Sequence, residues 1–75
     1  MFRFGLPRAG AVTLTLFDQQ GRRVRELIRG VQTAGEHRVS WDGCDALGVR
    51  VASGLYFARL EHDGQRLVTR VIETR

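Results

Sequence analysis

The residues with the clearest chemical potential lie in one short stretch of the chain. Asp42 and Asp45 flank Gly43, and carboxylate oxygens are the ligands that Ca²⁺ prefers. An EF-hand loop needs oxygen ligands at alternate positions, but Cys44 and Ala46 follow Asp42 at those positions. An Asp next to a Gly more often accepts hydrogen bonds from its own turn, so the sequence favours a structural turn over a metal site.

The candidate nucleophiles have no visible partners. Cys44 is the only cysteine, so it can form no disulfide within the chain, and two scattered histidines supply no zinc ligand set. Ser53 lies outside any Gly-x-Ser-x-Gly motif, and His37 and His62 fall in separate segments. We therefore expect no catalytic residue, no metal site and no bound cofactor, and we predict that the chain is not an enzyme.

The charge balance raises nucleic acid as a partner. The net charge is +4, and all 12 basic residues are arginines. Most of them are spread singly among acids, and only the segment from Arg22 to Arg29 is a cluster, which is more typical of a solvated strand face than of a phosphate-binding patch. We expect no nucleic-acid partner.

A chain of 75 residues has room for one small core, so residues 1–75 are predicted to form a single domain without a deep pocket. The longest apolar runs are far shorter than the roughly 20 residues that cross a bilayer, and no membrane span is expected. The N-terminus lacks the charged and apolar regions of a secretory signal, so an export signal is not expected in this chain.

The positions of the candidate residues depend on strands that alternate apolar and polar side chains. Val12, Leu14 and Leu16 share one face of a strand predicted over residues 11–18. Gly21 then suits a tight turn, and residues 22–30 can return as the partner strand, although their apolar spacing also fits a helical turn.

Three further segments show strand or turn signals. The segment 35–43 places His37, Val39 and Trp41 on one face, so that Trp41 would end a strand facing the core. The dipeptide Asp63-Gly64 is typical of a two-residue hairpin turn between the last two strands. Phe2 and Phe4 share a face of a first strand that Pro7 ends.

These signals predict an all-β fold of six or seven short strands, an antiparallel sandwich or a small barrel. The predicted core contains Val12, Leu14, Leu16, Val39, Trp41, Tyr56 and Leu60.

The order of several short motifs extends along nearly the whole chain. They are Phe4 to Pro7, Phe17-Asp18, Gly21, Val24, Leu27, Ala34-Gly35, His37, Val39, Trp41 to Gly43, Asp45, Gly48, Ala52 to Gly54, and Tyr56-Phe57. With this order and spacing, the chain resembles the immunoglobulin-like module of flagellar hook-capping proteins and of the C-terminal sorting domains of type IX secretion cargo. The resemblance implies a small immunoglobulin-like β-sandwich without enzymatic activity, joined to a larger secreted or cell-surface bacterial protein.

Two functions follow from this resemblance. In the first, an outer-membrane secretion machine recognises the C-terminal strand, and the residues that match the sorting members are Arg70, Val71, Ile72 and Arg75. Glu73 and Thr74 depart from that pattern, because apolar residues are common there. In the alternative, the module is a structural self-assembly unit of an extracellular filament or cap, and it associates through its sheet edges. The expected partners are therefore proteins: secretion machinery, neighbouring domains or copies of the chain.

Overall fold

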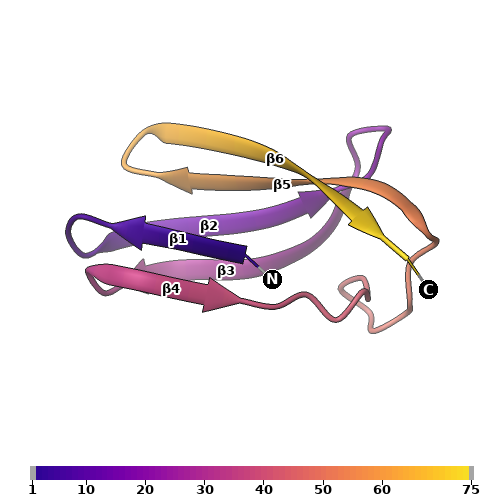
Figure 1. Ribbon diagram of the computed structural model, residues 1–75, viewed down its shortest axis with the longest axis horizontal. Helices are drawn as coiled ribbons and strands as arrows, with labels where there is room; N and C mark the ends of the chain where they lie inside the picture. Colours follow the sequence, from indigo (N-terminus) through magenta and orange to yellow (C-terminus); the bar gives the residue numbers. More distant parts are fainter. Residues whose placement is uncertain (1, 75) are drawn as a thin grey trace.

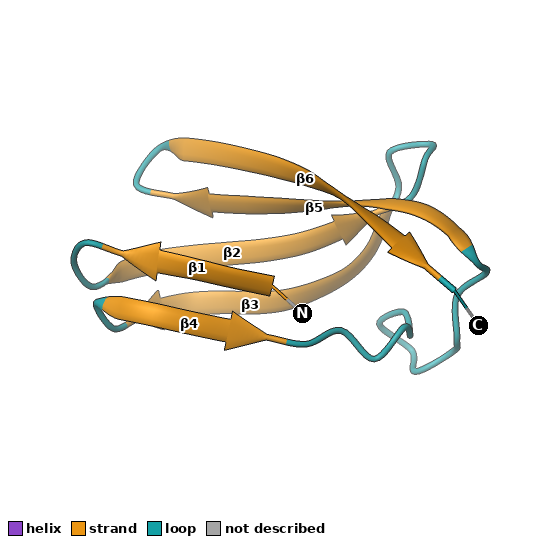
Figure 2. Ribbon diagram, in the orientation of Figure 1, coloured by secondary structure: helices purple, strands orange, loops and turns teal. Residues whose placement is uncertain are grey.

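The computed structural model describes residues 2–74, which form six β-strands in two antiparallel sheets (Figures 1 and 2). The strands are β1 (Phe2–Leu6), β2 (Gly10–Phe17), β3 (Arg23–Gln32), β4 (Gly35–Val39), β5 (Gly54–His62) and β6 (Gln65–Glu73). The prediction of an all-β sandwich with six or seven strands is confirmed. No helix in the described part of the chain is long and apolar enough to cross a membrane.

The two sheets differ in width. The small sheet contains only β1 and β4, whereas the large sheet has the strand order β3-β2-β5-β6. In Figure 1 the small sheet is drawn over β2 and β3, and β5 and β6 extend beyond it. The small sheet thus covers the inner faces of β5 and β6 less than those of β2 and β3.

The centre of the core lies on β2, as its alternation predicts. Val12, Leu14 and Leu16 are between 0% and 3% exposed and face the small sheet. Leu14 and Leu16 form one buried cluster with Ala58 of β5. Of the other predicted core residues, Tyr56 is buried, while Val39, Trp41 and Leu60 are half-buried and pack against the cluster.

The segment whose apolar spacing also fits a helical turn forms the strand β3. It pairs with β2 along its whole length, but the register shifts between Leu14 and Thr15 and again between Leu16 and Phe17. Each shift inserts an extra residue on β3, which resets the alternation of side chains. Val24, Leu27 and Ile28 can therefore all pack against the core from a strand.

The predicted turns have the expected backbone. Asp63 and Gly64 both have positive φ, 52° and 75°, which is the geometry that a two-residue hairpin turn requires. The turn after β2 is closed by the carboxylate of Asp18, which accepts hydrogen bonds from the backbone N–H groups of Gln20 and Arg22 at 2.9 Å.

The position of Trp41 differs from the prediction. Strand β4 ends at Val39, so Trp41 lies two residues beyond the strand, in the loop that leads to β5. Val39, the last residue of β4, pairs with Phe2, and the backbone then leaves the sheet for a turn in which Asp42 accepts a hydrogen bond from the backbone N–H of Cys44. Trp41 nevertheless packs against the core cluster.

Candidate interaction groove

The two carboxylates that suggested a metal site belong to turns. Asp42 accepts a hydrogen bond from the backbone N–H of Cys44 and another from Nη1 of Arg25, at 3.0 and 2.7 Å. Asp45 accepts hydrogen bonds from the backbone N–H groups of Leu47 and Val49. Within residues 2–74, no three His, Cys, Asp or Glu side chains are grouped so that they could hold a metal ion.

The electrostatics of Asp42 fit this structural role. The hydrogen bond from the backbone of Cys44 is the main cause that lowers its pKa, and the nearby Arg25 guanidinium lowers the pKa further. Partial desolvation acts in the opposite direction. The backbone N–H of Cys44 and the Arg25 guanidinium therefore favour the charged form of the Asp42 carboxylate.

The arginine cluster is largely paired with acids. Arg22 forms an ion pair with Asp18, and Arg25 forms one with Asp42. Arg23 and Arg29 both lie within 4.0 Å of the carboxylate of Glu26. All four arginines of the cluster thus have a carboxylate partner, which reduces the positive charge that this face offers to phosphate groups.

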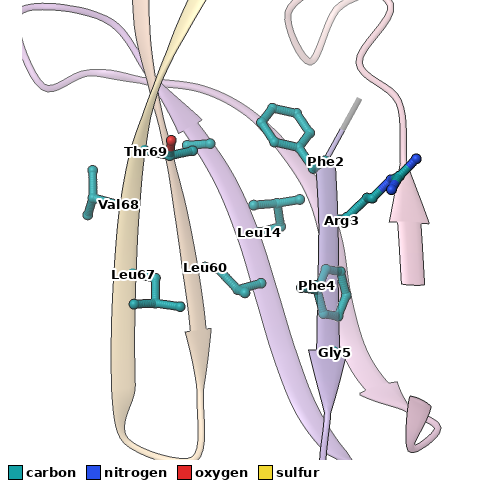
Figure 3. Close-up of a pocket in the computed structure, with 10 residues that line it drawn as sticks. Phe2, Arg3, Phe4, Gly5, Leu14, Leu60, Leu67, Val68 and Thr69 are labelled. Carbon is teal, nitrogen blue, oxygen red and sulfur yellow. The ribbon is translucent and has the colours of Figure 1, made fainter. Parts of the chain in front are cut away.

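An apolar groove runs along the uncovered side of the sandwich, with a volume of about 460 Å³. Figure 3 shows that its two walls come from different sheets, with β1 on one side and β5 and β6 on the other. We call this the inter-sheet groove. Its lining residues are Phe2, Arg3, Phe4, Gly5, Leu14, Ala58, Leu60, Leu67, Val68 and Thr69.

The apolar character of the groove follows from strand pairing. Leu67 lies opposite Leu60, and Thr69 lies opposite Ala58, so these side chains form rows on the inner face of the large sheet. A wider small sheet would cover these rows, but the small sheet stops at β1. Leu67 is consequently 68% exposed although it lies on the inner face.

Both strands that border the groove are edge strands. Within the described residues, β1 pairs only with β4, and β6 pairs only with β5. The outer edge of each strand offers backbone N–H and C=O groups that another strand could pair with. The inter-sheet groove therefore combines an apolar surface with two strand edges. Both features favour the binding of a protein segment.

The residues predicted to bind a partner fall on both faces of β6. Val71 is half-buried and packs against the core cluster, so it serves the fold. Arg70 and Ile72 point to the opposite face, and Ile72 is 70% exposed. Arg75 lies outside the described residues. Arg70, Val71 and Ile72 are on the edge strand β6, and none of the three lines the groove.

Sequence reasoning missed the groove residues Phe4 and Leu67. Pairing with β5 places Leu67 on the inner face, where an apolar side chain is usually buried. No sequence signal showed that the opposite layer ends before it covers that position.

Comparison with known proteins supports the same architecture. The sequence model of the FlgD Ig-like domain family matches residues 3–65 of the chain. The basal-body rod modification protein FlgD of Salmonella typhimurium is 44% identical to the chain over 48 residues, and that of Salmonella typhi matches to the same extent. The matched region is 64% of this chain and 21% of either relative, so the chain corresponds to about a fifth of their length.

No solved structure gives a significant match. By name, both relatives modify a basal-body rod, and they lend no support to a type IX sorting domain. Because the family model spans most of the chain and agrees with the six-stranded sandwich, the chain belongs to the family of FlgD Ig-like domains.

Proposed function

We propose that the chain is a non-catalytic structural module that joins protein subunits in an extracellular, flagellum-type assembly through its sheet edges. Membership of the FlgD Ig-like family supports this proposal, as does the name of the Salmonella relatives, which describes modification of the basal-body rod. Family membership also supports a location outside the cytoplasm, at the cell surface.

The observation on which the proposal depends is the inter-sheet groove beside the edge of β1. Contiguous apolar surface is costly to expose to water, and it commonly marks a site of protein association. The exposed apolar side chain of Leu67 lies on the inner face of a sheet, which is normally a buried place. A strand or loop from another subunit would cover it.

The sequence of β1 suits pairing with a second copy of itself. In an antiparallel pair centred on Phe4, Arg3 of each copy would lie opposite Gly5 of the other, so the two positive charges are not directly opposed. Phe2 would lie opposite Leu6, which keeps apolar side chains on the groove side. Such pairing would join the two small sheets into one across a two-fold axis.

The sorting-domain hypothesis receives less support. It assigns recognition to Arg70, Val71, Ile72 and Arg75, but the Salmonella relatives are named for modification of a basal-body rod and not for sorting.

The test is the mass of the 75-residue chain in solution, measured by light scattering from about 10 µM to about 1 mM. We expect the mass to rise with concentration, and the substitution Leu67→Lys to shift the chain toward monomer, because a charge would then lie in the groove. Leu47→Lys is the matched control, since Leu47 is 88% exposed on a loop outside the groove. A chain that stays monomeric throughout, or equal effects of both substitutions, would contradict the proposal.

A further inference from the structure

We propose that the free edge of β6 binds an extended protein segment with the pattern acid–apolar–apolar–apolar–acid, which adds to the large sheet as a new edge strand. This inference rests on the proposed function, because it takes a sheet edge as a contact site. It goes further by assigning the chemistry of the partner.

The backbone of β6 is suited to strand addition. The strand is nine residues long and pairs with β5 without a register shift, from His62 opposite Gln65 to Gly54 opposite Glu73. It contains no proline, and its other edge has no partner strand among residues 2–74. Natural sheets usually protect such edges with bulges, prolines or a covering segment, so a long regular edge favours pairing with another chain.

The outer face of β6 determines the charges of the partner. Arg66, Val68 and Arg70 follow one another at every second position on this face. The carboxylate of Glu61 lies 3.6 Å from Arg66 but is shared with Arg59. Within the described residues Arg70 forms no ion pair closer than 4.0 Å, and Val68 is 59% exposed. Two acids four residues apart, with an apolar residue midway, would match this row.

The inner face determines the two remaining positions. Leu67 and Thr69 alternate with the outer row and face the inter-sheet groove. Residues of an added strand opposite them would point to the same side and extend the apolar surface of the groove. They should therefore be apolar, which completes the five-residue pattern.

The same features select against other occupants of this edge. A second copy of β6 would bring two arginines from each chain onto one face of the pair, where like charges repel. A nucleic acid would match the arginines with its phosphates, but it has no peptide backbone to pair with the strand. The edge of β6 thus differs from that of β1, whose sequence suits self-pairing.

The probe for the test is a capped peptide with the core Glu-Val-Val-Val-Glu, flanked by Gly-Ser at each end. Its binding to the 75-residue chain is measured by fluorescence anisotropy and by backbone NMR shifts. We expect shifts along β6 and at least about tenfold weaker binding by the double variant Arg66→Glu/Arg70→Glu. That variant should in turn prefer the charge-reversed peptide with the core Lys-Val-Val-Val-Lys, an outcome that misfolding could not produce.

The matched control variant is Arg23→Glu/Arg38→Glu, which changes the net charge equally at exposed positions of β3 and β4, outside both β6 and the inter-sheet groove. When both proteins are measured in high salt, where long-range attraction is screened, this control should bind the acidic peptide as tightly as the unmodified chain does. A peptide with the core Val-Glu-Val-Glu-Val, which moves the acids to the inner face, should bind at least about tenfold more weakly.

Several results would overturn the inference: no binding of the acidic peptide at about 1 mM, equal losses in both double variants, or NMR shifts outside β6. Tighter binding of a single-stranded DNA of the same net charge would assign the arginines to nucleic acid instead. The mass measurement above separates this inference from the proposed function. If the chain associates through the groove but ignores the peptide, only the role of β6 is wrong.

Discussion

The indole ring of Trp41 lies edge-on to the phenol ring of Tyr56, with ring centroids 5.4 Å apart and planes at 70°. Both rings also donate hydrogen bonds to the loop between them: Nε1 of Trp41 to the carbonyl of Cys44 at 2.8 Å, and the hydroxyl of Tyr56 to the carbonyl of Ala52 at 2.6 Å. The pair thus ties the loop between β4 and β5 to the core. In a domain this small, which has no internal disulfide, such a link contributes a large share of the stability.

Substitution of Trp41 should show the size of that share. Trp41→Ala removes the ring contact and the hydrogen bond, and we expect it to lower the free energy of unfolding by about 3 kcal/mol, because the ring is half-buried and packs against the core. Trp41→Phe, which keeps a ring but loses the N–H donor, should cost about 1 kcal/mol. Urea denaturation followed by circular dichroism measures both values, and an unchanged midpoint for Trp41→Ala would contradict the role given to the ring.

A methyl group at Gly43 should also destabilise the fold. Gly43 is buried and has a φ of 80°, and a Cβ there would lie 2.7 Å from a carboxylate oxygen of Glu73. We expect Gly43→Ala to cost about 1 to 2 kcal/mol, mainly from the left-handed backbone conformation, because the Glu73 carboxylate is the end of a flexible side chain that can move aside. Gly5→Ala is the control, because a Cβ at Gly5 meets nothing within 4 Å. Thermal unfolding of the two variants should give clearly different midpoints.

Acid should weaken the protein through Asp18 and Asp42. Hydrogen bonds from the backbone of Arg22 and of Cys44, respectively, are the main causes that lower the pKa of these carboxyls in the folded state. The unfolded chain, with an aspartate pKa of about 3.9, therefore binds protons more readily than the folded protein in acid. The stabilisation is fully present above that value and is lost as the pH falls through the folded pKa.

The measurement is the free energy of unfolding in urea from neutral pH down into the acid range. Asp18→Asn and Asp42→Asn should each flatten the loss of stability below about pH 4, because one titrating group is removed. Both carboxyls are near the surface, so the effect should be modest and should shrink in high salt. Equal slopes for the variants and the unmodified chain would show that other groups control acid unfolding.

The central strand should be the most sensitive part of the core. Leu16 is fully buried, and Leu16→Ala is expected to lower the free energy of unfolding by about 3 kcal/mol through lost burial and the cavity that remains. Leu47→Ala deletes the same atoms from a side chain that is 88% exposed, and its effect should stay within about 0.5 kcal/mol. Similar losses in the two variants would mean that the core is placed wrongly.

Local patterns in the sequence were enough to predict β2, the Asp63-Gly64 turn and the end of β1 before Pro7. In each case the cause acts over a few residues: side chains alternate along an extended backbone, Gly accepts positive φ, and Pro lacks a backbone donor. The turn role of Asp42 follows from an equally short-range signal, because an Asp next to a Gly accepts hydrogen bonds from the backbone of its own turn.

Features that depend on pairing between distant segments could not be read in this way. The bulges of β3 place Leu27 and Ile28 side by side against the core, and they arise only from the register with β2. Trp41 lies beyond its predicted strand, in a loop where its Nε1 donates a hydrogen bond to the carbonyl of Cys44.

The inter-sheet groove is the clearest case. The register of β6 with β5 places Leu67 on the inner face, but whether an inner face is buried depends on the width of the opposite sheet. That width is the outcome of how β1 and β4 pair across more than thirty residues of chain. Local sequence fixes the direction in which a side chain points, whereas only the packing of whole sheets fixes what it meets.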